Sequence, residues 1–241
     1  MTIETVPPVL ELRDVHSHIG VSHILQGVTF HVPANKVTVV LGRNGVGKTS
    51  TLRSILGMMK RTGTITFNGE SIVDEKTHNI IRRGIAYVPE DRDVFHGLTV
   101  EENLKLAEVK GGEHRYDLVY ELFPEMKQRT RQAAGTLSGG QQQMLSLSRA
   151  LLNENKLMLI DEPTKGLAPR VVSEVVRALE RAREVATIVM VEQNLAAAKR
   201  LAGHVVVIGE GRTISEGGPA LLEDEGHVRS LLGIGVKRGA H

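Results

Sequence analysis

The chain has 241 residues, enough for one large α/β domain, and its shares of hydrophobic (41%) and charged (24%) residues are ordinary for a globular protein. Its 30 basic and 28 acidic residues nearly balance and only 3% of residues are aromatic, so we expect no nucleic-acid partner. The absence of cysteine excludes disulfides and thiol catalysis. We find no signal peptide and no apolar run of the ~18–20 residues that span a membrane. Any membrane association is therefore expected to depend on a partner.

Short segments of alternating polarity occupy the first part of the chain. Residues 9–15 and 28–32 alternate apolar and polar side chains, as half-exposed antiparallel strands do. Residues 63–67 have a similar character, and Asn68 and Gly69 after them are typical of a hairpin turn. We therefore expect an antiparallel β subdomain near the N-terminus.

A glycine-rich loop, Gly42-Arg-Asn-Gly-Val-Gly-Lys48-Thr49, follows the apolar residues 37–41, which are typical of a buried parallel strand. Glycines let backbone N–H groups converge on one point, and the helix that follows adds partial positive charge there. The pattern predicts nucleotide binding, with Lys48 reaching the β- and γ-phosphates and Thr49 ligating Mg²⁺. A plain glycine turn is the alternative. The predicted nucleotide ligands are Gly42, Arg43, Asn44, Gly45, Val46, Gly47, Lys48, Thr49 and Ser50.

The composition changes after a candidate helix at 77–83 and a candidate strand at 85–88. Residues 90–135 are rich in charge and in helix formers, with a capping box from Thr99 to Glu102. An amphipathic helix is predicted at 118–126, interrupted at Pro124. We interpret this block as a mostly helical insertion between two parallel strands.

Alternating helices and strands are expected again after Leu137. The helices are predicted at 138–152, with Ser138 as N-cap, at 171–183 and at 195–201, and the strands at 157–160, 187–191 and 205–208. A hairpin-like turn and two short helices are expected after Gly211.

Two carboxylates, Asp161 and Glu162, end the apolar strand at 157–160. The carboxyl end of a central parallel strand is where open α/β sheets bind ligands. Asp161 is predicted to hold Mg²⁺, and Glu162 to act as the general base on the attacking water. A strand followed by a charged turn is common on its own, but its combination with the glycine-rich loop favours the functional interpretation.

The segment Leu137-Ser-Gly-Gly-Gln-Gln-Gln143 places a serine and two glycines at a predicted helix start, which is a second anion-receptive N-terminus. One nucleotide does not need two such sites, so we expect this one to face the γ-phosphate held by another subunit. A helix cap with a flexible lead-in is the alternative.

The three motifs, in this order, resemble the ATP-binding subunits of ABC transporters over essentially the whole chain. The resemblance implies one nucleotide-binding domain, with a P-loop NTPase core and antiparallel β part at 1–89 and 136–241 and a helical subdomain at 90–135. It also implies ATP hydrolysis with Mg²⁺ in a head-to-tail dimer. Each ATP then lies between one P-loop and the partner's signature residues Ser138, Gly139, Gly140 and Gln141.

Phrases such as AYVPEDRDVF, DEPTKGLAP and VEQNL are similar to the shorter ATPase of importers for branched-chain amino acids, and most to the version in urea and short-amide importers. Such importers combine two ATPases, identical or related, with two membrane-spanning permeases and a solute-binding protein. The implied location is the cytoplasmic face of the cell membrane, where the helical insertion touches a permease.

Four residues depart from the general family pattern. Glu90 replaces a glutamine, and its carboxylate is predicted to ligate Mg²⁺ or to order water. Gln193 replaces the switch histidine and can hydrogen-bond a γ-phosphate, although it cannot titrate near neutrality. Ile19 replaces the aromatic residue that stacks on adenine, and Ala168 replaces an aspartate. Because Glu162 and Lys48 are present, hydrolysis is still predicted, with Gln193 assisting.

Two other functions stay open on the sequence alone. A soluble ABC ATPase acting on nucleic acid is disfavoured by the near-neutral charge and by the single cassette. A low-activity regulatory cassette is suggested by Ile19 and Gln193. The ten histidines show no H-E-x-x-H spacing and are expected to be surface or core residues.

Overall fold

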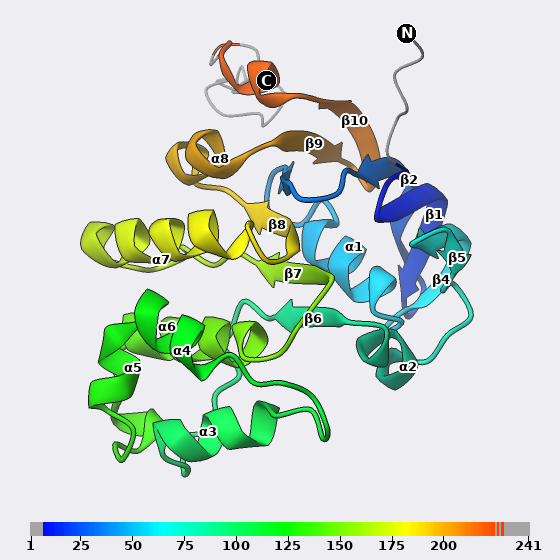
Figure 1. Ribbon diagram of the computed structural model, residues 1–241. Coiled ribbons are helices and arrows are strands. Elements are labelled where there is room, and N and C mark those ends of the chain that lie inside the picture. Colours follow the sequence, from blue (N-terminus) through cyan, green and yellow to red (C-terminus); the bar gives the residue numbers. More distant parts are fainter. Residues whose placement is uncertain (1–6, 225, 227, 229–241) are drawn as a thin grey trace, which may run out of the picture.

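The computed structural model describes residues 7–224, 226 and 228, and a six-stranded sheet lies at its centre (Figure 1). The strand order is β10-β9-β3-β8-β7-β6; β10 is antiparallel to β9, and the other neighbours are parallel. Because all five strands predicted for the parallel sheet lie here, the predicted α/β fold is confirmed. The strands are β3 (Val37–Leu41), β6 (Ile85–Val88), β7 (Leu157–Asp161), β8 (Thr187–Glu192), β9 (His204–Gly209) and β10 (Arg212–Gly217).

Alternate residues of the central strands enter two separate hydrophobic cores. Val39 of β3 packs in one core and Val40 in the other, and Met190 and Val191 of β8 divide in the same way. Since side chains alternate across a strand, a strand covered on both faces must be apolar on both. This is why β3 and β8 are nearly continuous apolar runs and are buried along their whole length.

A second, antiparallel sheet has the order β2-β1-β4-β5. β1 and β2 are longer than the predicted 9–15 and 28–32, because irregularities near Asp14 interrupt the polar–apolar alternation. Asp14 has a φ of 50°, and a Cβ on Gly63 would lie 2.2 Å from its carbonyl oxygen. The strands are β1 (Leu10–Ile19), β2 (Ser22–Val32), β4 (Lys60–Phe67) and β5 (Glu70–Ser71), the last two joined by the predicted turn at Asn68 and Gly69.

Helices cover both faces of the central sheet (Figure 1). α1 (Lys48–Ile55) and α2 (Thr77–Arg82) contribute to the core between the two sheets. The opposite core contains α6 (Gly139–Leu151), α7 (Pro169–Ala182) and α8 (Leu195–Leu201). The first short tail helix is the 3-10 turn η2 (Pro219–Leu222), and the second predicted one lies largely outside the described residues.

The segment 90–135 contains three helices, α3 (Val100–Ala107), α4 (Tyr116–Leu122) and α5 (Pro124–Gln128), and the start of the 3-10 turn η1 (Ala134–Thr136). The predicted capping box is present: Glu102 N donates to Thr99 Oγ1 at 3.2 Å, and Thr99 N donates to the Glu102 carboxylate at 2.8 Å. The interruption at Pro124 separates α4 from α5, since proline cannot donate a helical hydrogen bond. These helices pack on α6 at one end of the molecule.

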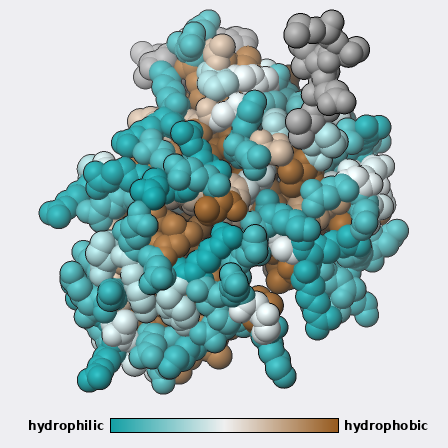
Figure 2. All heavy atoms as spheres, in the orientation of Figure 1, coloured by the Kyte–Doolittle hydropathy of each residue, from teal (hydrophilic) through white to brown (hydrophobic). Residues whose placement is uncertain are grey.

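The face shown in Figure 2 is mostly hydrophilic, and hydrophobic residues are visible mainly in hollows between elements. Within the described part of the chain, no helix combines the length and the apolar composition that crossing a membrane requires.

Candidate active site

The glycine-rich loop joins β3 to the first turn of α1 at the carboxyl edge of the central sheet. Gly47, the residue before α1, has a φ of 107°, and a Cβ there would meet the Leu25 side chain at 2.8 Å. Glycine is therefore required by the backbone conformation, and a side chain there would also displace Leu25. The Lys48 ammonium is buried under the loop and donates to the carbonyl oxygens of Gly42 and Arg43, each at 3.0 Å. Burial lowers the pKa of Lys48, and the nearby Glu162 and Asp161 carboxylates partly offset this effect.

Asp161 ends β7 directly beside the loop, since β7 and β3 flank β8 in the sheet. Thr49 Oγ1 donates to Asp161 Oδ1 at 3.0 Å, and the Tyr87 hydroxyl lies 3.4 Å from Asp161 Oδ2. Burial raises the pKa of Asp161 to about 6, although the Thr49 hydrogen bond lowers it. The residues predicted to hold Mg²⁺ thus include one buried carboxylate and one hydroxyl that already touch.

Glu162 has a φ of 47°, an uncommon conformation for a residue other than glycine, and its side chain is only 7% exposed. Gln193 Nε2 donates to its Oε1, and Lys48 Nζ lies 3.7 Å from the same oxygen. Its Oε2 accepts no well-aligned hydrogen bond from any residue that the structure describes, although Lys165 Nζ is 3.3 Å away. This oxygen is buried and lies next to the Lys165 ammonium, so a water molecule could reach it only after the side chains around it move.

The sequence analysis missed Glu192, which organises both segments around Glu162. Its buried carboxylate accepts from the Thr164 hydroxyl at 2.6 Å and from the backbone N–H groups of Gln193 and Asn194, each at 2.8 Å. The turn after β7 is thereby bound to the turn after β8. A carboxylate ending a neighbouring parallel strand is the sequence signal that could have found it.

A second missed residue, Lys165, forms ion pairs with two predicted site residues. Lys165 Nζ lies 2.5 Å from Glu90 Oε1 and 3.3 Å from Glu162 Oε2. Glu90 therefore reaches the site, but its carboxylate is paired with a lysine and forms no hydrogen bond with Asp161. These contacts raise the pKa of Lys165, chiefly through Glu90 and then Glu162.

These residues surround a hollow of about 510 Å³ at the loop. Ile19, 57% exposed at the end of β1, is one of the residues that line it, and its contact with a nucleotide base stays a prediction. Five other predicted site residues lie beside this hollow but are not part of its lining: Gly42, Arg43, Val46, Asp161 and Gln193. The lining consists of Ile19, Ile24, Asn44, Gly45, Gly47, Lys48, Thr49, Ser50, Glu90, Glu162 and Lys165.

The predicted signature residues begin α6 and do not line this hollow. Ser138 caps the helix, with Gln141 N donating to its Oγ at 3.3 Å, and Gln141 Nε2 donates to Glu125 at 2.7 Å. A Cβ on Gly139 would lie 2.9 Å from a terminal nitrogen of Arg92, a residue that the sequence analysis did not select. The start of α6 therefore carries both a helix N-terminus and a guanidinium group.

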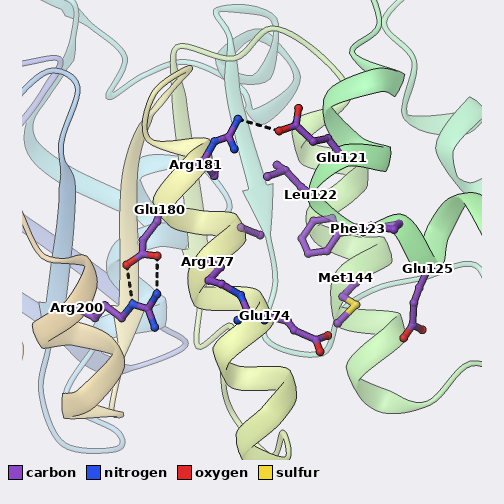
Figure 3. Close-up of a pocket in the computed structure, with 12 residues that line it drawn as sticks. Glu121, Leu122, Phe123, Glu125, Met144, Glu174, Arg177, Glu180, Arg181 and Arg200 are labelled. Carbon is purple, nitrogen blue, oxygen red and sulfur yellow. Dashed lines mark hydrogen bonds and ion pairs between the residues drawn. The ribbon is translucent and has the colours of Figure 1, made fainter.

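A larger hollow, about 580 Å³, lies between the α4–α5 segment and α7 (Figure 3). Its charged side chains are largely paired: Arg181 donates to Glu121 at 2.9 Å, and Arg200 donates to Glu180 at 2.7 and 2.8 Å. It lies away from the glycine-rich loop, and we assign it no chemistry.

A glycine-rich loop at a helix N-terminus, facing two carboxylates at the end of a parallel strand, defines a P-loop nucleotide-binding ATPase. The sequence pattern of the ABC transporter family matches residues 25–165. The chain belongs to the ABC transporter family and is an ATP-binding, ATP-hydrolysing subunit of that class.

Two curated relatives are similar over nearly their whole length. The high-affinity branched-chain amino acid transport ATP-binding protein BraG of Pseudomonas aeruginosa is 39% identical, over 88% of this chain and 94% of its own. The probable branched-chain amino acid transport ATP-binding protein LivF of Archaeoglobus fulgidus is 36% identical, over 92% and 99%. Among solved structures, an ATP-binding subunit of an ABC transporter superposes with a TM-score of 0.76 at 29% identity, covering 96% of this chain and 95% of its own.

Proposed function

We propose that this protein is the motor subunit of an importer for branched-chain amino acids or for related small amides such as urea. The observation that carries the proposal is the convergence of Lys48, Thr49, Asp161 and Glu162 at one edge of the sheet. The relatives BraG and LivF, whose names specify branched-chain amino acid transport, support the substrate class. Urea rests only on the similarity of short sequence phrases.

In the proposed reaction, the loop N–H groups and Lys48 bind the phosphates of ATP. Lys48 must exchange its bonds to the Gly42 and Arg43 carbonyls for phosphate oxygens. Glu162 orients the attacking water through Oε2 and accepts its proton as general base. Gln193 holds the opposite carboxylate oxygen and offers its amide to the γ-phosphate.

The donor set fits Mg²⁺, a hard cation that prefers oxygen ligands. Thr49 Oγ1 and Asp161 Oδ1 lie 3.0 Å apart, close enough to share one ion, and the buried Asp161 carboxylate gains from a counter-ion. Glu90 can join them only by leaving Lys165. When bound, the ion neutralises charge that develops on the phosphates.

Dimerisation would complete the site. Ser138, Gly139, Gly140 and Gln141 do not line the P-loop hollow of their own chain, which supports a head-to-tail pair in which they contact the partner's ATP. The helix N-terminus of α6 and Arg92 both favour a phosphate there. The partner is a second copy of this chain or a related ATPase.

A groove of about 420 Å³ between β6 and the helical segment supports docking to a membrane-spanning permease at the cytoplasmic face of the membrane. Phe95 is 47% exposed within it, and the Arg149 guanidinium lies 4.9 Å from its ring centroid. Exposed apolar residues at a groove are typical of a protein-binding site. Because Glu90 precedes this segment in the chain, permease contact and nucleotide contact share one connected stretch. A solute-binding protein would join through the permeases.

The size of the Glu162→Gln protein, measured with and without ATP and Mg²⁺, tests whether two subunits together form the ATP site. We expect a dimer only with ATP, and we expect the additional change Ser138→Arg to abolish it while nucleotide binding persists. A monomer under all conditions would require a different partner ATPase.

Hydrolysis by the wild type with its partners should fall at least about 100-fold in Glu162→Gln. Equal turnover of the two proteins would refute Glu162 as the base.

Uptake assays test the transport function. Proteoliposomes that contain the permeases, the wild-type protein and any partner ATPase, with the solute-binding protein outside, should accumulate leucine or urea when ATP is inside. Glu162→Gln should not support uptake. ATP hydrolysis that no permease or solute stimulates would instead favour a non-transport or regulatory ATPase.

A further inference from the structure

The two sheets meet along β2 and β10, and hydrogen bonds hold this seam. Gln26 N donates to Gly211 O at 2.8 Å, and His31 N donates to Glu216 Oε1 at 2.9 Å. On its other side β2 is paired with β1, and β10 is paired with β9. The backbones at the seam are therefore fixed, and the side chains that the strands direct into it stay close to one another.

A cluster of two histidines and one glutamate lies in this seam, one residue from each of β2, β9 and β10. His31 Nδ1 is 2.7 Å from Glu216 Oε1, and His204 Nε2 is 3.0 Å from the same oxygen. The two imidazole centroids are 4.8 Å apart, and no two of the three donor atoms are farther apart than 4.8 Å. His204 is buried, whereas His31 and Glu216 reach solvent. The cluster thus has one closed side and one open side.

We propose that His31, His204 and Glu216 bind one transition-metal ion, with Zn²⁺ the best match. Two imidazoles and one carboxylate are the ligands that Zn²⁺ takes at about 2.0–2.2 Å, with water completing a tetrahedron. Ligand atoms around such an ion are ~3.3 Å apart. The three donor atoms here lie within 4.8 Å of one another, and rotation of the exposed His31 side chain brings its nitrogen to the shorter distance. Glu216 supplies a negative charge that attracts a cation to the two imidazoles.

The sequence analysis expected these histidines to be surface or core residues, because it searched for ligands on one helix. Here the ligands come from three strands that the fold brings together: His204 and Glu216 lie on the neighbouring strands β9 and β10, and His31 on β2 is far from both in the chain. A bound ion would join β2 of the antiparallel sheet to β9 and β10 of the central sheet. It would act on the stability of this seam and is distinct from the Mg²⁺ site at Thr49 and Asp161. A hydrogen-bonded cluster without metal is the competing interpretation.

Zinc titration of the metal-stripped, full-length protein without nucleotide tests the proposal. Calorimetry should show one Zn²⁺ bound at the His31, His204 and Glu216 cluster of each chain. The thermal unfolding midpoint should rise with Zn²⁺ but not with Mg²⁺ alone, because Mg²⁺ prefers oxygen ligands. Co²⁺ at the same site should show the visible absorption of a nitrogen-ligated tetrahedral ion. The absence of both the midpoint rise and this absorption would refute the site.

The variants His31→Ala and Glu216→Gln should each weaken Zn²⁺ binding by more than about tenfold. His31 is exposed, so its variant tests the site even if Glu216→Gln folds poorly. His16→Ala is the matched control, because His16 contacts His23 and Asp14 in a separate cluster. Binding unchanged in His31→Ala, or lost in His16→Ala, would place the ion elsewhere and overturn the proposal. None of these measurements depends on ATP hydrolysis.

Discussion

At the scale of single residues, Lys165 changes the chemistry expected from the sequence motifs. It pairs with Glu90 at 2.5 Å and lies 3.3 Å from Glu162, so one cation bridges a predicted metal ligand and the predicted base. Lys165 therefore competes with Mg²⁺ for Glu90. Because Lys165 is 52% exposed, we expect the competition to be modest.

Replacement of Lys165 by methionine should lower the Mg²⁺ concentration that half-saturates ATP hydrolysis by about two- to fivefold. The reason is that the Glu90 carboxylate would be released towards the ion. Steady-state hydrolysis against free Mg²⁺ at fixed ATP measures the change. Lys156→Met, which removes an exposed lysine outside the hollow, serves as the control and should leave the Mg²⁺ dependence as in the wild type.

Asp161→Asn should stabilise the protein in the absence of metal and nucleotide by up to about 3 kcal/mol at pH 7.5. Burial raises the folded-state pKa of Asp161 from 3.8 to about 6, so its ionised form opposes folding. A raised carboxyl pKa means that this destabilisation grows as pH rises from about 4 through about 6. The excess thermal midpoint of the variant should therefore be several degrees at pH 7.5 and shrink towards pH 5.

Thermal unfolding in a metal chelator measures this difference, and the exposed Asp91→Asn serves as control. A variant less stable than the wild type at pH 7.5 would contradict the assigned cause. The same variant should lose Mg²⁺-dependent hydrolysis, since it lacks the charge of the predicted ligand.

The sequence predicted Lys48, Thr49, Asp161 and Glu162 together, because strand ends and a helix N-terminus place them at the same edge of the sheet. Lys165 and Arg92 could not be found in this way. Lys165 lies in a turn whose backbone direction depends on tertiary contacts, such as the bond of Glu192 to Thr164. Arg92 has a φ of 67°, which its residue type does not indicate, and by composition each is an ordinary surface charge.

At the scale of secondary-structure elements, the contact between α6 and α7 fixes the signature residues. A Cβ on Gly140 would lie 2.7 Å from Val171 Cγ1. Valine is stiff about χ1, so α7 itself would have to shift. Glycine at this position thus brings the start of α6 against the start of α7.

Gly140→Ala should destabilise the protein by about 1–3 kcal/mol through overpacking, although alanine ordinarily favours a helix. In the Glu162→Gln background it should also weaken the ATP-dependent dimer. Chemical denaturation and sizing measure the two effects. Gly97→Ala is the matched control, because a Cβ there meets nothing within 4 Å. A Gly140→Ala variant more stable than the wild type would show that α7 can shift without a cost in folding free energy.

Elements with strong local signals were predicted within two residues, including α8, whose predicted bounds agree with Leu195–Leu201. The predicted strands at 9–15 and 28–32 were too short, since the irregular pairing near Asp14 breaks the period of two on which the prediction relied. The capping box at Thr99 was predictable because all its contacts are local.

At the scale of the whole molecule, the groove at Phe95 relates the proposed motor to its proposed membrane partner. Phe95→Glu should reduce binding to the permeases by more than about tenfold, because it removes the exposed apolar ring and substitutes a hydrophilic carboxylate that can pair with the neighbouring Arg149. Co-purification with the permeases measures this loss, and nucleotide binding should persist. Leu106→Glu is the control, because Leu106 is an apolar residue outside the groove and is exposed to a similar degree, 59% against 47% for Phe95. Undiminished co-purification of the Phe95 variant would place the interface elsewhere.

The position of β3 between β8 and β9 bears on how the protein is made. The ribosome produces the P-loop strand early, but both of its neighbours belong to the last quarter of the chain. Pairing over such a sequence separation is slow, and until it happens the loop has no sheet edge on which to form. A nascent chain that ends before β8 should therefore not retain ATP. The enzyme would acquire its nucleotide only when synthesis is nearly complete, which keeps unfinished chains from hydrolysing ATP or pairing through a half-built site.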